Sequence, residues 1–109
     1  MGIFPDHVSG WLRDIAESGS DPVLQAMHAE AAERGFPIVG PEVGRLLFQL
    51  ASLRKAERIF ELGSGFGYST LWFARALDSG GRIYHTDGDG TNTAKARDYL
   101  DRAGEMEKV

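Results

Sequence analysis

A glycine-rich turn between an apolar segment and a helix most constrains the fold of this 109-residue chain. Residues 58–62 read as a short strand, Gly63, Gly65 and Gly67 follow at alternate positions, and a helix is predicted over residues 69–77. Glycine lacks a Cβ, so the backbone can reverse tightly and a ligand can approach it closely. The helix would direct free N–H groups and its positive dipole end at the turn, where a carboxylate or phosphate is stabilised.

The order of strand and helix repeats beyond this turn. Residues 82–86 read as a second strand, and a helix is predicted over residues 93–103 with Gly104 as its cap. Strand, helix, strand, helix is the opening of a doubly wound parallel sheet, so the fold class is predicted to be α/β. Neither strand alternates cleanly between apolar and polar residues, which is typical of strands that helices cover on both faces.

Two acidic residues accompany the turn. Glu61 precedes the first glycine by two residues, and Asp87 follows Gly67 by 20 residues at the end of the second strand. The carboxyl ends of neighbouring parallel strands form one crevice, where a carboxylate typically takes both hydroxyls of a ribose. The glycine spacing alone is equally compatible with a plain turn, but the two acids and the strand–turn–helix context favour a nucleoside site.

Two familiar nucleotide motifs do not match. A dinucleotide fingerprint needs its third glycine one residue later, where Tyr68 stands, and a P-loop needs a Gly-Lys-Ser/Thr sequence that is absent. A fragment of a nucleotide-binding oxidoreductase nevertheless stays open as an alternative. So does a non-enzymatic module that only oligomerises.

The first 56 residues read as an all-helical lead-in, and residues 57–109 as the amino-terminal half of a nucleotide-binding domain. Apolar periodicity predicts helices over residues 8–15, with Gly19 as a stop, and over residues 41–53. Between them, Asp21-Pro22 predicts a helix start and Gly35 its end. Further expectations are a solvated face of Glu30, Glu33 and Arg34, core packing of Trp72, and a core or interface role for Trp11 and Leu12.

Composition excludes several function classes. The net charge is −4 and no basic cluster occurs, so nucleic acid is not an expected partner. There is no cysteine, and no apolar run approaches the roughly 20 residues of a membrane span. The amino terminus has no features of a signal peptide, so a cytoplasmic location is expected. The three histidines lack the spacing of a metal site.

Residues 36–104 resemble the small-molecule O-methyltransferases of the catechol and caffeoyl-coenzyme A type, within the class I S-adenosylmethionine-dependent methyltransferases. The resemblance is carried by residues 36–44, by residues 59–71 with the Gly-Tyr-Ser sequence that starts at Gly67, and by residues 81–87. It implies a Rossmann-like fold, S-adenosylmethionine as cofactor and a small hydroxylated, catechol-like methyl acceptor. It further implies cofactor contacts from Val39, Gly40, Glu61, Gly63, Ser64, Gly65, Gly67, Tyr68, Ser69, Asp87 and Gly88.

Individual roles follow from the same resemblance. Glu61 would support the turn near the methionine end of the cofactor, the Ser69 hydroxyl would bind the methionine carboxylate, and Asp87 would bind the ribose. Val39 and Gly40 would touch the amino-acid end through their backbone. Gly88, which would lie near the adenine, stands where relatives usually carry an apolar residue, so this loop is expected to be looser.

The chain ends at Val109, about where a third strand would start. We therefore expect the amino-terminal part of such an enzyme, truncated after the second strand–helix unit. In the family resembled, the divalent-metal ligands, the catalytic base and most of the acceptor pocket come from the other half, so no catalytic or metal-binding residue is assigned. The chain alone is expected to be inactive. An unpaired edge of strand 58–62 predicts a homodimer, a higher oligomer or aggregation.

Overall fold

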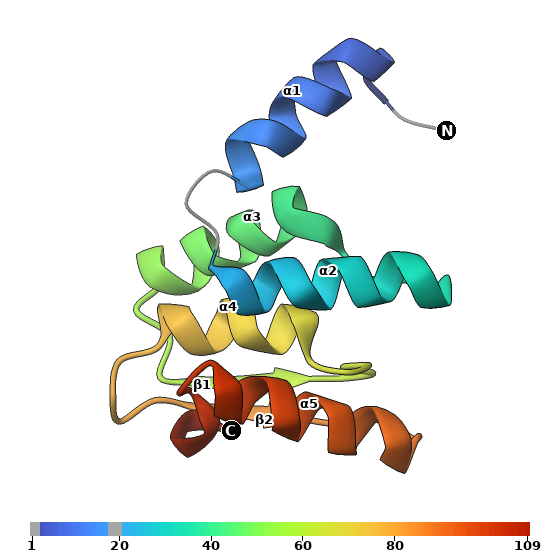
Figure 1. Ribbon diagram of the computed structural model, residues 1–109. Helices are drawn as coiled ribbons and strands as arrows, with labels where there is room; N and C mark the ends of the chain where they lie inside the picture. Colours follow the sequence, from blue (N-terminus) through green and yellow to red (C-terminus); the bar gives the residue numbers. More distant parts are fainter. Residues whose placement is uncertain (1–2, 18–20) are drawn as a thin grey trace.

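The computed structural model describes residues 3–17 and 21–109, and its architecture confirms the α/β class (Figure 1). Helix α1 lies at one end of the molecule, on α3, and the layer of α2, α3 and α4 separates it from the strands. The elements in chain order are α1 (Asp6–Glu17), α2 (Pro22–Arg34), α3 (Gly40–Leu53), β1 (Arg58–Glu61), α4 (Tyr68–Ala76), β2 (Arg82–His85), α5 (Gly90–Arg102) and the short 3₁₀ helix η1 (Met106–Lys108).

The two strands form a parallel sheet, in register from Arg58 opposite Arg82 to Glu61 opposite His85. The expectation that helices cover both faces is wrong for the described residues. Ile83 is buried against α4, whereas Phe60 and Tyr84 on the opposite face are 65% and 49% exposed. The strands therefore do alternate in burial, and one face of the sheet presents aromatic rings to solvent.

Capping explains where the helices begin and end. The Asp21 side chain accepts a hydrogen bond from the backbone N–H of Leu24 at 2.9 Å, and Gly35 ends α2 in the left-handed conformation, as predicted. Helix α5 begins at Gly90, three residues earlier than predicted, because the Asp89 carboxylate caps it. The predicted stop at Gly19 lies outside the described residues.

The main core joins α2, α4 and α5 beneath the glycine turn. Trp72 is buried as predicted, and it packs so closely on α3 that a Cβ added to Gly44 would lie 2.1 Å from its Nε1. Trp11 is 62% exposed, so core packing is wrong for this residue. The core residues are Leu24, Met27, Ala31, Phe66, Tyr68, Leu71, Trp72, Ala96, Tyr99 and Leu100.

The expectation that Glu30 belongs to a solvated face of α2 is wrong, because its side chain contacts α5. Its carboxylate accepts hydrogen bonds from Lys95 at 2.5 Å and from the Tyr99 hydroxyl, both on α5. The bonds from Lys95 and Tyr99 lower the pKa of Glu30. Burial, followed by the bond to Glu30, raises the pKa of Tyr99 to about 12. Glu30, Lys95 and Tyr99 thus connect α2 to α5, and α5 borders the glycine turn.

Candidate cofactor site

A cavity of about 420 Å³ opens where the glycine turn, the start of α4 and the end of β2 meet the loop before α3. Its volume is within the range of small-molecule sites. Six of the eleven predicted site residues line it. The lining residues are Phe36, Pro37, Ile38, Val39, Gly63, Gly65, Tyr68, Ser69 and Asp87.

The three glycines of the turn have different surroundings. All have a positive φ: +70° at Gly63, +56° at Gly65 and +95° at Gly67. No heavy atom lies within 4 Å of a Cβ built on Gly63, so this residue leaves open space at the cavity. A Cβ on Gly67 would lie 2.9 Å from the Cβ of Ala96. Gly67 is buried and does not line the cavity, so it serves the close packing of the turn on α5.

Glu61 ties the end of β1 to the first turn of α4. Its Oε1 accepts a hydrogen bond from the Thr70 hydroxyl at 2.5 Å, and its Oε2 accepts one from the Ser69 hydroxyl. Glu61 itself does not line the cavity. Because Ser69 has one hydroxyl proton and gives it to Glu61, it would have to rotate before it could donate to a ligand carboxylate. The backbone N–H groups at the start of α4 need no such change.

Asp87 lies two residues beyond the end of β2 and lines the cavity. Its Oδ1 accepts hydrogen bonds from the backbone N–H of Asp89 at 2.8 Å and from the Asn92 side chain at 3.2 Å. Its Oδ2 accepts one from the backbone N–H of Gly65 at 2.8 Å. These bonds, with that of Asp89 the largest cause, lower the pKa of the Asp87 carboxyl. The carboxylate is therefore ionised at neutral pH, and it lies beside the turn, as the sequence predicts.

Ser64, Gly40 and Gly88 do not line the cavity. The buried Ser64 fastens the turn to β2, because its N–H donates to the carbonyl of Thr86 at 2.7 Å and its hydroxyl accepts from the N–H of Thr86 at 3.0 Å. Gly88 is exposed, and a Cβ there would meet no heavy atom within 4 Å.

Sequence reasoning missed several residues of the site. Phe36 lies 3.0 Å from the position of a Cβ on Gly65, which explains why this position of the turn needs a glycine. His85 contacts the Gly65 carbonyl through Nε2 at 3.0 Å, and a carbonyl only accepts, so Nε2 carries the proton in this contact. The only local signal was the position of Phe36 inside the segment that carries the family resemblance.

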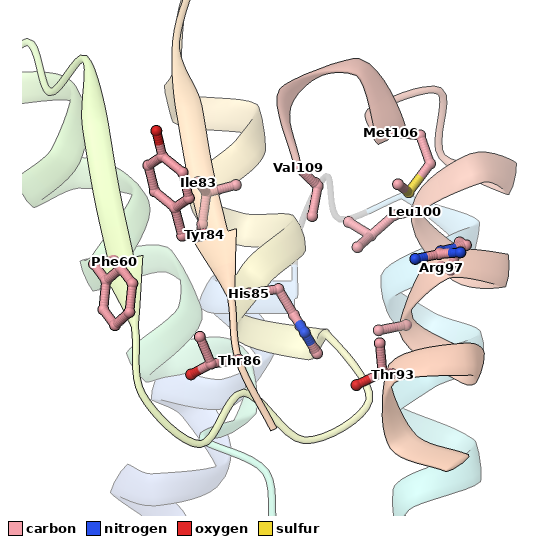
Figure 2. A pocket seen from close by; sticks show the side chains of 11 residues that line it. Phe60, Ile83, Tyr84, His85, Thr86, Thr93, Arg97, Leu100, Met106 and Val109 are labelled. Carbon is pink, nitrogen blue, oxygen red and sulfur yellow. The ribbon is translucent and has the colours of Figure 1, made fainter. Parts of the chain in front are cut away.

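A second cavity, of about 320 Å³, lies along the edge of β2 that faces away from β1, between this strand and α5 (Figure 2). Its walls are mostly apolar, with Ile83 on the strand, Leu100 on the helix and Val109 above them. None of the eleven predicted site residues lines it. The predicted residues thus gather at the glycine turn and not at this groove.

Two kinds of feature are absent from the part of the chain that the structure describes. No group of three or more His, Asp or Glu side chains gathers there in a way that could hold a metal ion. In residues 3–17 and 21–109, no helix is both long enough and apolar enough to cross a bilayer.

Comparison with known proteins gives one consistent family. The sequence model of a family described as O-methyltransferase matches residues 16–109. A catechol O-methyltransferase of Niastella koreensis is 38% identical over 106 residues, which are 95% of this chain and 48% of that protein. The chain therefore spans about half the length of this curated relative.

Solved structures of methyltransferases resemble this chain as well. A methyltransferase from Geobacter sulfurreducens superposes with a TM-score of 0.89 at 34% identity, over 99% of this chain and 56% of that one. The O-methyltransferase TomG from Streptomyces achromogenes, solved in complex with S-adenosylmethionine, gives a TM-score of 0.80 at 32% identity, over 90% of this chain and 46% of that one. With the sequence match over most of its residues, this chain belongs to the O-methyltransferase family.

Proposed function

We propose that this chain is the S-adenosylmethionine-binding part of an O-methyltransferase, and that the cavity at the glycine turn holds the cofactor. The proposal rests on one observation. Gly63, Gly65, Ser69 and the ionised Asp87 line the same cavity of about 420 Å³. The complex of TomG with S-adenosylmethionine supports the choice of ligand. The family match favours this proposal over an oxidoreductase fragment.

The lining of the cavity suits the two ends of such a ligand. The amino end of α4 offers its positive dipole end to the methionine carboxylate. Asp87 offers an anionic acceptor to the ribose, and Gly63 leaves space beside it. We assign Val39, which lines the same cavity, to the amino-acid end of the cofactor. Glu61 holds Ser69 and so positions the start of α4.

Bound S-adenosylmethionine supplies an electrophilic methyl group for transfer to an oxygen. The contribution of this chain is to fix the donor in place, since alignment of donor and acceptor is worth up to about 7–11 kcal/mol in favourable cases. We propose a small hydroxylated, catechol-like acceptor, which the relative from Niastella koreensis supports by its description. That the 109 residues alone transfer no methyl group stays a prediction. Turnover of a catechol in a radiolabelled-methyl assay would contradict it.

Self-association and a cytoplasmic location also stay predictions. The outer edge of β1 has no partner strand among the described residues, and Phe60 beside it is exposed. Unpaired strand edges associate. We therefore expect a homodimer or a higher oligomer in light scattering, and a clean monomer at high concentration would refute this.

Calorimetric titration of S-adenosylhomocysteine tests the cofactor assignment, with NAD as the competing ligand. Asp87→Asn should weaken binding of S-adenosylhomocysteine by about tenfold to a hundredfold, since hydrogen bonds to charged groups are worth about 1.5–3 kcal/mol. Asp101→Asn removes an equal charge from an exposed position of α5 and should leave the affinity unchanged. Equal binding of NAD, or an unaltered affinity in Asp87→Asn, would overturn the proposal.

A further inference from the structure

Phe36 belongs to the wall of the cavity at the glycine turn, and the end of α2 fixes its backbone. Its N–H donates to the carbonyl of Ala31 at 2.9 Å, and the N–H of Gly35 donates to the carbonyl of Ala32 at 3.3 Å. With Gly35 in the left-handed conformation, these are the two bonds of a Schellman motif. The motif places the backbone of Phe36 but not its ring, which is only partly buried.

The Phe36 ring packs directly on the glycine turn. Its Cε1 lies 3.0 Å from the position of a Cβ on Gly65, which also lines the cavity. The rings of Phe36 and Phe66 meet edge to face, with centroids 5.1 Å apart and an interplanar angle of 70°, a favourable arrangement for two aromatic rings. Phe66 is buried within the turn itself. A displaced Phe36 ring would therefore alter the cavity wall and the packing of the turn together.

Arg34 lies over both of these rings. Its Cζ is 5.2 Å from the centroid of Phe36 and 5.4 Å from the centroid of Phe66. Both distances are within the roughly 6 Å at which a guanidinium is attracted by the face of an aromatic ring. Arg34 is the last residue of α2, so its guanidinium connects the end of this helix to the glycine turn through the two rings.

Glu30 holds the guanidinium from one turn earlier in α2. Its Oε1 accepts a hydrogen bond from Nη1 of Arg34 at 3.2 Å. The same carboxylate is bound by Lys95 and Tyr99 of α5, so its position does not depend on Arg34 alone. The planar guanidinium can bond a carboxylate and lie over aromatic rings at the same time.

We propose that Arg34 is a positioning residue for the cofactor, because it holds the Phe36 ring against the glycine turn in the free protein. The inference rests on the proposed binding of an adenosyl cofactor in this cavity. Arg34 does not line the cavity and acts through Phe36, which does. A wall that is ordered before the ligand arrives does not have to be ordered on binding, so the affinity is higher.

Arg34→Met removes the guanidinium and keeps an unbranched apolar side chain at the end of the helix. Calorimetry should show that this variant binds S-adenosylhomocysteine about threefold to tenfold more weakly than the wild type, the scale of one or two exposed cation–π contacts. Arg102→Met is the matched control, because Arg102 lies 5.0 Å over the Tyr99 ring and pairs with Asp98 at 3.9 Å, away from the cavity. It should keep the wild-type affinity.

Wild-type affinity in Arg34→Met, or an equal loss in Arg102→Met, would overturn the inference and leave the proposed function standing. Failure of the wild type to bind S-adenosylhomocysteine would instead overturn the proposed function, and this inference with it. A spectroscopic arm needs no ligand. The amide shift of Gly65 in the free chain should change in Arg34→Met and stay unaltered in Arg102→Met, and an unaltered shift in both would contradict the role of Arg34.

A double-mutant cycle tests whether Arg34 acts through the Phe36 ring. Phe36→Leu removes the aromatic ring and should itself weaken binding of S-adenosylhomocysteine. In this background, Arg34→Met should cause little further loss of affinity, because the ring that the guanidinium holds is gone. Losses that simply add in the double variant would show that Arg34 does not act through Phe36. Urea unfolding confirms that each variant is folded before its affinity is compared.

Discussion

Gly63 and Gly67 belong to one turn, but the structure gives them different roles that alanine substitution separates. At Gly67, φ is +95°, and an added Cβ would lie 2.9 Å from the Cβ of Ala96 and 3.3 Å from its Cα. At Gly63, φ is +70° and no heavy atom lies within 4 Å of the added Cβ. Gly63 lines the cavity and Gly67 does not.

The expected magnitudes follow from these two environments. A left-handed conformation costs a residue with a Cβ about 1–2 kcal/mol, and both variants bear this cost. Overpacking adds about 1–3 kcal/mol at Gly67 alone, because Ala96 cannot rotate away. Gly67→Ala should therefore lower the free energy of unfolding by about 2–5 kcal/mol, and Gly63→Ala by about 1–2 kcal/mol. Since native domains are typically stable by about 5–15 kcal/mol, we expect Gly63→Ala to stay folded.

Urea unfolding followed by circular dichroism measures both values, and calorimetry with S-adenosylhomocysteine measures binding by the folded Gly63→Ala variant. Despite its smaller loss of stability, Gly63→Ala should bind the ligand more weakly than the wild type, because its new methyl group occupies the cavity. Equal stability of the two variants would refute the packing role of Gly67. Wild-type affinity in Gly63→Ala would remove Gly63 from the site.

Two further predictions concern the scaffold. Gly44→Ala should lower the free energy of unfolding in urea by at least about 1–3 kcal/mol, because its Cβ would lie 2.1 Å from Nε1 of Trp72. Gly10→Ala, which has open space on α1, should raise the free energy of unfolding by about 0.8–1 kcal/mol. Equal effects would contradict this packing. The raised pKa of Tyr99, about 12, means that the fold favours the neutral phenol. Stability should therefore fall as pH rises from about 10 to about 12, and Tyr99→Phe should abolish this loss; an identical alkaline profile in the variant would contradict it.

The sequence predicted most elements because their signals are local. Asp21 and Gly35 delimit α2 by capping chemistry that depends on a few neighbouring residues. The start of α5 was missed because Asp89 lies only two residues after Asp87, and its capping role shows only in the folded backbone. The exposed face of Phe60 and Tyr84 was also missed, since burial depends on which distant segments cover a strand.

The site was predictable where topology alone decides it. The turn and Asp87 meet because the carboxyl ends of parallel strands share one edge, and the bond from Gly65 to Asp87 confirms that they are adjacent. The bond of Ser69 to Glu61 and that of His85 to the turn depend on side-chain rotamers, which the sequence does not encode locally. The division of the chain at residue 56 stays a prediction. The main core contains residues of α2, which precedes residue 56, and of α4 and α5, which follow it.

Amide chemical shifts give the most direct test that the glycine turn and Asp87 form an adenosyl site. The ¹⁵N-labelled chain is titrated with S-adenosylhomocysteine, and shifts are mapped residue by residue. The largest changes should fall on Gly63, Gly65 and Asp87, with little change at Ile83 and Leu100 in the second cavity. Changes centred on Ile83 and Leu100, or a spectrum that the ligand leaves unaltered, would contradict the account.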